Sequence, residues 1–141
     1  MITTPKALAQ AKLEFGCEEL EGIELEYSGN PDVAGSNWEK RIMYNDIMSQ
    51  GLEFEPTLYS KITLHAMEDT GWYTADITYG QGIIWGKDRG CEFHTDRCVE
   101  NKIPNFEAEF CNTFNSFSQC DVGHLNKGVC GITKYYSRIP A

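Results

Sequence analysis

The sequence predicts an α+β fold in which a part built from helices and strands is followed by a loop-rich part held together by disulfide bonds. Two observations support this class. The first half contains two kinds of segment in turn: some have apolar residues at helical spacing, and others are short and have an apolar residue at every second position. Beyond Gly80, glycine, asparagine and cysteine dominate and no long periodic segment remains. We therefore expect a boundary near residues 75–80.

The first predicted elements have clear end signals. Thr4 suits the N-cap of a helix, Pro5 suits its first position and Gly16 suits its C-terminal stop. In residues 23–27, apolar residues alternate with glutamates, which predicts a strand with one face towards a core. Residues 28–32, with the sequence Ser-Gly-Asn-Pro-Asp, predict a turn after this strand.

Later segments are less uniform. Residues 38–48 fit no single element, because apolar residues at helical spacing are surrounded by residues typical of turns. The spacing of apolar residues over 58–67 predicts a second helix, which ends at Gly71. The alternation of apolar residues over 73–79 predicts a second strand.

Composition excludes several classes of protein. A net charge of -9, from 21 acidic and 12 basic residues, argues against a nucleic-acid binder, which needs a basic surface. No apolar run approaches the roughly 20 residues of a membrane-spanning helix. Residues 1–17 contain no apolar segment of the kind found in signal peptides. Yet five of the six cysteines lie within residues 91–130, and such a cluster is typical of proteins from oxidising compartments. We therefore expect that Met1 is not the true start of the protein.

The histidines and cysteines offer few candidate sites. His65, His94 and His124 are too far apart to form the pair of a helical H-E-x-x-H zinc motif. Cys91, His94 and Cys98, spaced C-x2-H-x3-C, could contribute to a structural zinc site, with Cys120 and His124 further on, but disulfide bonds explain these cysteines without the histidines. No serine or cysteine is assigned as a nucleophile, because no histidine–acid pair accompanies one. His65 is expected on a helix surface or in the core.

Several short segments follow one another in an order that is similar to a known family. These segments are Thr4–Leu8, Phe15–Cys17, Leu20–Glu26, Ala34–Arg41, Tyr59–Lys61, Glu68–Tyr73, Trp85–Lys87 and Gly90–Cys91. With them, and with the spacing of all six cysteines, the chain resembles the leishmanolysin-like zinc metallopeptidases, which are metzincins. The resemblance extends over residues 3–132 without a large gap.

The resemblance implies roles for particular residues. Metzincins bind zinc through H-E-x-x-H and a third histidine, and a methionine-containing turn follows. Asn37 takes the position of the third ligand and Met48 that of the methionine turn. Residues 1–77 would be the C-terminal part of the catalytic region, and residues 78–141 the start of a cysteine-rich domain. The first two ligands and the general base match nothing in the chain, so no catalytic residue is assigned and we expect these groups upstream.

The resemblance also pairs the cysteines. It implies two disulfide bonds within the chain, Cys17–Cys91 and Cys111–Cys130, and partners outside the chain for Cys98 and Cys120. The chain therefore resembles a piece of the family's polypeptide that is shortened at both ends.

The implied function is peptide-bond hydrolysis by water that one zinc ion activates, with protein or peptide substrates. The implied location is the secretory pathway, outside the cell or at its surface, with membrane association through segments not in this chain. Asn37 departs from the family, because an amide oxygen is a weak zinc donor, and Glu39 could replace it only with a shifted backbone. The chain alone is expected to be inactive. The alternatives are a catalytically inactive pseudopeptidase that acts as a cell-surface or extracellular binding or adhesion module, and an unrelated disulfide-linked structural domain.

Overall fold

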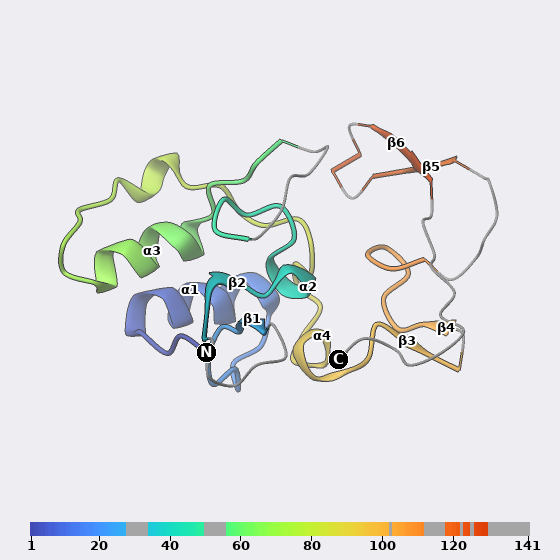
Figure 1. Cartoon of the computed structure of the whole chain (residues 1–141), viewed down its shortest axis with the longest axis horizontal. Coiled ribbons are helices and arrows are strands. Elements are labelled where there is room, and N and C mark those ends of the chain that lie inside the picture. The colour runs from blue at the N-terminus through green and yellow to red at the C-terminus, as the bar shows by residue number, and fades with distance from the viewer. Residues whose placement is uncertain are drawn as a thin grey trace. The chain divides into compact units, whose positions relative to one another are not determined.

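The computed structural model contains helices and small antiparallel sheets, which confirms the predicted α+β class (Figure 1). It describes residues 1–27, 34–49, 56–101, 103–111, 118–121, 123–124 and 126–129. Internal contacts divide the chain into unit 1, Met1–Thr95, and unit 2, Asp96–Ala141. Residues 78–95 thus pack within unit 1, whereas the family resemblance begins the cysteine-rich domain at residue 78. The division into residues 1–77 and 78–141 stays a prediction about the family's architecture.

Unit 1 carries most of the regular structure. In chain order it contains α1 (Pro5–Phe15), β1 (Leu25–Tyr27), β2 (Ala34–Trp38), α2 (Lys40–Met43), α3 (Lys61–Asp69), the 3-10 helix η1 (Ile77–Tyr79) and α4 (Glu92–Thr95). Helices α1 and α3 pack side by side, and β1 pairs antiparallel with β2 (Figure 1). The core draws its largest fully buried side chains from several of these elements: Phe15, Ile23, Trp38, Ile42, Ile62 and Phe93.

Helix α1 has the ends that the sequence predicts. It runs from Pro5 to Phe15 with Thr4 as an extended N-cap, and Gly16 follows with a φ of 69°. Only glycine adopts this left-handed conformation without strain, so it stops the helix. The predicted strand is shorter than the alternation suggested, since β1 begins at Leu25. Tyr27 is exposed, so its predicted place facing the core is wrong. The predicted turn at residues 28–32 lies outside the described residues.

Helix α3 begins later than predicted, at Lys61, because Leu58 is engaged elsewhere. The N–H of Leu58 donates to the carbonyl of Asn45, at 2.8 Å, and its carbonyl accepts from the N–H of Ile47, at 2.8 Å. Ser60 is the N-cap of the helix, and its hydroxyl accepts from the N–H of Thr63 at 3.1 Å. A side-chain acceptor at this position satisfies a donor that the first helical turn leaves open.

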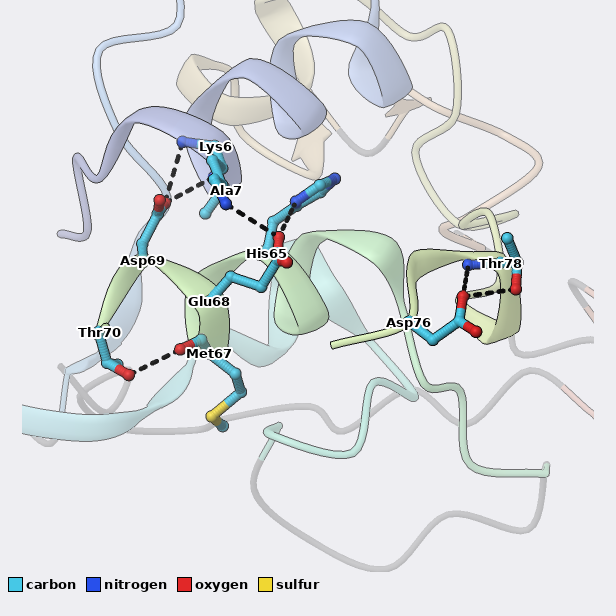
Figure 2. A network of polar contacts seen from close by, with 9 residues as sticks. All are labelled: Lys6, Ala7, His65, Met67, Glu68, Asp69, Thr70, Asp76 and Thr78. Carbon is cyan, nitrogen blue, oxygen red and sulfur yellow. Dashed lines mark hydrogen bonds and ion pairs between the residues drawn. The ribbon is translucent and has the colours of Figure 1, made fainter. Parts of the chain in front are cut away.

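The strand predicted over residues 73–79 is wrong. The segment contains η1, whose N-cap Asp76 accepts from the N–H of Thr78, at 3.0 Å, and from its hydroxyl, at 2.6 Å (Figure 2). Local side-chain bonds of this kind offer the backbone an alternative to strand pairing. Tyr73 and Tyr79 are both exposed, so the alternation of apolar residues marks no buried face.

Unit 2 is built from short hairpin-like pairs. Its described strands are β3 (Val99–Glu100) with β4 (Ile103–Pro104), and β5 (Ser118–Cys120) with β6 (Lys127–Val129), and both pairs are antiparallel. Cys98 and Cys120 are free cysteines. Cys111 is disulfide-bonded, and Cys130, its expected partner, lies outside the described residues. No helix in the described part of the chain has both the length and the apolar character needed to cross a membrane.

The N-terminus of α1 is capped by the side chain of Asp69, which belongs to α3. Oδ2 of Asp69 accepts from the N–H groups of Lys6, at 2.9 Å, and Ala7, at 3.0 Å, while Glu68 lies between Lys6 and His65 (Figure 2). Burial would raise the pKa of Asp69, but these hydrogen bonds lower it below its ordinary value. Asp69 thus caps a helix other than its own.

Replacing this cap should weaken the packing of α1 on α3. We expect Asp69→Ala to lower the free energy of unfolding by about 1 kcal/mol, because two donors at the start of α1 lose their acceptor. Urea unfolding of the oxidised chain measures the change. Asp76→Ala is the matched control, since it removes a cap of the short η1 only, and equal effects of the two substitutions would contradict this role of Asp69.

Candidate functional site

The candidate site begins with the strand that carries Asn37. Strand β2 pairs so closely with β1 that a Cβ added at Gly35 would overlap the carbonyl oxygen of Glu26, which requires glycine there. The side chain of Asn37 is half-buried, and its Oδ1 lies 3.4 Å from the hydroxyl of Ser36. The strand therefore fixes the backbone of Asn37, while its side chain makes one weak contact with its sequence neighbour.

A turn formed by residues 45–48, which we call the 45–48 turn, lies beside this strand. The N–H of Trp38 donates to the carbonyl of Met48 at 3.0 Å, and Trp38 also forms a bridge with Ser49. The residue after Asn37 is thus paired directly with Met48. The two positions that the family resemblance assigns to the third ligand and the methionine turn lie on adjacent backbones.

The carboxylate of Asp46 holds this turn in place from inside the protein. Asp46 is 3% exposed, and its Oδ1 accepts from the N–H of Met48 and from the hydroxyl of Thr63, both at 2.8 Å. Its Oδ2 accepts from the N–H of Ser60 at 3.3 Å. The hydroxyl of Thr63 accepts in turn from the indole N–H of Trp38 at 2.8 Å. One buried acid therefore links the 45–48 turn, the start of α3 and strand β2.

Arg41 connects the same region to α4. Its guanidinium donates to the carbonyl of Phe93, at 2.8 Å, and to that of His94, at 2.7 Å. The carbonyl of Arg41 accepts from the indole N–H of Trp85 at 2.8 Å. The disulfide between Cys17 and Cys91, the pair that the resemblance implies, ties the end of α1 to the residue before α4. Helix α4 is thus attached both covalently and by hydrogen bonds.

Glu39 is the N-cap of α2. Its carboxylate accepts from the N–H of Arg41 at 3.3 Å. Burial raises the pKa of Glu39 above its ordinary value, the bond from Arg41 opposes this rise, and the charges of Glu26 and Glu24 add to it. The bond from Arg41 therefore holds Glu39 in its capping position.

The described residues do not make a zinc site by themselves. Within the described ranges, no three His, Cys, Asp or Glu side chains lie close enough together to hold a metal ion. His65 lies on α3 with its Nδ1 3.1 Å from Glu68, and His94 lies among aromatic rings. Cys91 is in a disulfide bond, so it cannot serve as a thiolate in the C-x2-H-x3-C alternative. The fit of a zinc ion to these residues alone is therefore poor.

Sequence reasoning missed Asp46 and Arg41, which organise the site. Arg41 stands inside a segment that matches the family, but nothing local announces its partners on α4, more than fifty residues away. Asp46 stands two residues before Met48 in the sequence, and Ser60 with Thr63 has the spacing of a helix N-terminus. These two local signals could have suggested a connection, although not the buried carboxylate between them.

The comparisons with known proteins agree on one family. A family model described as leishmanolysin, a peptidase family, matches residues 1–141. A leishmanolysin homolog of Crithidia fasciculata is 32% identical over 99% of this chain and 21% of its own length. Leishmanolysin of Leishmania donovani is 32% identical over 94% of this chain and 22% of its own length. A leishmanolysin-like peptidase of Drosophila pseudoobscura pseudoobscura is 42% identical over 71% of this chain and 14% of its own length. The chain spans about a fifth or less of these relatives.

Removing the buried carboxylate should destabilise unit 1 strongly. We expect Asp46→Ala to lower the free energy of unfolding by about 3 kcal/mol, because several buried donors would lose their acceptor at once. Urea unfolding followed by tryptophan fluorescence, to which the buried Trp38 contributes, measures this loss. Asp76→Ala is the control, since it removes an exposed acid whose side chain accepts hydrogen bonds from Thr78 in the short η1. The role of Asp46 would be disproved by a loss no larger than that of the control.

Proposed function

This chain belongs to the leishmanolysin family of peptidases, and from this premise we propose that it supplies the third-ligand strand and the methionine turn of a leishmanolysin-like zinc metalloendopeptidase. The observation that carries the proposal is the backbone pairing between Trp38 and Met48. Metzincins need a methionine turn next to the segment of the third ligand. The pairing supports these roles for the strand of Asn37 and for the 45–48 turn.

The proposed role is positional. The described residues do not form a zinc site on their own, so we assign no catalytic step to them. Asp46 and Arg41 would hold the 45–48 turn and α2 in fixed positions, and a site completed by other ligands depends on such fixed positions. The substrate class follows from the family, and we propose protein or peptide substrates for the whole protein.

We place the protein outside the cell or at its surface. Two observations support this location, membership of the leishmanolysin family and the disulfide between Cys17 and Cys91. Disulfide bonds form and persist in oxidising compartments and are rare in the cytosol.

A second candidate function is favoured by one residue. Asn37 offers zinc an amide oxygen where the family position carries an imidazole, and zinc prefers nitrogen and sulfur ligands. On this reading, the protein keeps the family's scaffold, lacks peptidase activity and acts as an extracellular or cell-surface binding or adhesion module. The two candidates differ in whether the natural Asn37 permits zinc-dependent hydrolysis.

The chain by itself should not hydrolyse proteins in a zinc-dependent manner. The reason is that peptide hydrolysis at zinc requires ligands and a general base that its described residues do not bring together. The assay is cleavage of a denatured protein substrate with added zinc, beside an active zinc peptidase as the positive control. Turnover that a chelator abolishes would contradict the expectation.

Restoring an imidazole at Asn37 should restore zinc binding in a longer polypeptide. A segment bearing H-E-x-x-H is joined in front of the chain, and natural Asn37 is compared with Asn37→His. We expect zinc to bind at least tenfold more tightly to the His variant, about 1.4 kcal/mol, because a third imidazole completes the ligand set. Equilibrium dialysis or competition with a metal indicator measures the affinity.

Ser36→His is the matched control, because it adds the same imidazole to the adjacent position, whose side chain alternates to the other face of β2. Equal zinc affinity of the natural and Asn37→His forms would disprove the assignment of Asn37 to the third-ligand position. Hydrolysis by the natural Asn37 form supports the peptidase, whereas hydrolysis by the His form alone supports the binding module.

A further inference from the structure

His94 is a buried histidine whose ring nitrogens are not hydrogen-bonded. It is 8% exposed, and neither Nδ1 nor Nε2 has a hydrogen-bond partner within the described part of the chain. The ring of Phe15, on α1, meets it edge to face at a centroid distance of 4.5 Å, and the ring of Phe93 lies at 6.3 Å. The imidazole of α4 therefore packs as an apolar ring against α1.

The charged group that acts most strongly on this ring is the positive guanidinium of Arg41, which repels a protonated histidine. On the described elements of unit 1 around the ring, the charged residues are Lys12 and Glu14 on α1, Lys40 and Arg41 on α2, Asp88 and Arg89 before Cys91, and Glu92 on α4, and Asp96 follows α4 directly. Glu14 is engaged by the side chain of Gln10 and the N–H of Ile83. Burial, and then the positive charge of Arg41, lower the pKa of His94 to about 4.

Arg41 has two effects on α4. It binds the helix through hydrogen bonds, and its positive charge disfavours protonation of the His94 ring. Its guanidinium donates to the carbonyls of Phe93 and His94. A proton on the ring would bury a second cation beside this guanidinium, with no acceptor to receive the new N–H. The closed arrangement of α4 is therefore compatible with the neutral ring only.

We propose that His94 makes the attachment of α4 to α1 and α2 an acid-sensitive switch, closed when the ring is neutral and opened when the ring is protonated. In the open form, the ring leaves the pocket beside Phe15 and takes up a proton from water, and the bonds from Arg41 are lost. The disulfide Cys17–Cys91 keeps α4 tethered, so the opening is local and reversible. Because Arg41 follows Asn37 by four residues, the switch acts on the segment that carries the candidate site.

The pH window follows from the two states of the ring. Above about pH 7 the ring is neutral in both states, since a solvated histidine has a pKa of about 6.5. As the pH falls from there towards 4, the ring of His94 becomes protonated in the open form but stays neutral in the closed form. The equilibrium constant for opening then rises by up to about tenfold for each pH unit. Stability of the closed form is thus lost on acidification and regained at neutral pH.

The test measures amide hydrogen exchange of the oxidised chain at pH values from 7 to 4.5, corrected for the intrinsic rates. Protection of the amides of His94 and Thr95, both bonded to the carbonyl of Cys91, reports the closing of α4. We expect protection in the natural chain to fall by about tenfold between pH 6.5 and 5. In His94→Leu, which keeps an apolar side chain in the pocket, protection should stay nearly constant.

His65→Gln is the matched control, because it removes a different histidine, which is half-buried on α3, and should retain the fall seen in the natural chain. The proposal is overturned if His94→Leu loses protection with acid as the natural chain does. A second measurement needs no variant: nuclear magnetic resonance of the imidazole carbons follows protonation of His94 directly. A ring that titrates near pH 6.5 while the amides of α4 stay protected would also overturn the proposal.

Discussion

The 45–48 turn and the start of α3 meet at the buried carboxylate of Asp46, and the geometry of unit 1 depends on that meeting. Strand β2 joins them through the bond from the indole of Trp38 to Thr63. An ionised acid inside a protein is costly unless donors replace the water that it loses. Here the donors are the N–H of Met48, the N–H of Ser60 and the hydroxyl of Thr63. Because hydrogen bonds are directional, they fix the turn and the helix start more narrowly than apolar contact would. The 45–48 turn therefore has one position relative to α3.

A second constraint is the disulfide bond that joins the end of α1 to the residue before α4. The disulfide Cys17–Cys91 spans 74 residues, and closing so long a loop stabilises a fold by about 4 kcal/mol in the chain-entropy model. The bond brings α4 to the end of α1, but it does not orient the helix. Orientation comes from the two bonds of Arg41 and from the rings of Phe15 and Phe93. The disulfide therefore limits how far α4 can move, whereas the hydrogen bonds of Arg41 and the aromatic contacts set its orientation.

The parts of the fold that could be predicted are those with local causes. The ends of α1 are encoded by Thr4, Pro5 and Gly16, each of which acts on its own backbone. The alternation over residues 73–79 failed as a predictor because the side chain of Asp76 stabilised a tight turn instead. The disulfide between Cys17 and Cys91 was implied by resemblance to a family, not by local sequence. The burial of His94 had no local signal at all, since it depends on Phe15 and Arg41, which are distant along the chain.

Different bonds hold the scaffold and the side chain of Asn37, the residue that we propose for the third-ligand position. The bonds that hold the strand of Asn37 involve the backbone of Trp38, its indole, and the carboxylate of Asp46 behind them. The side chain of Asn37 takes part in none of these bonds, and its contact with Ser36 is long. Exchange of imidazole for amide at this position therefore costs the fold little. At this proposed third-ligand position, the side chain can therefore change without loss of the bonds that hold the strand and the turn, so either a peptidase or a binding module could use the same scaffold.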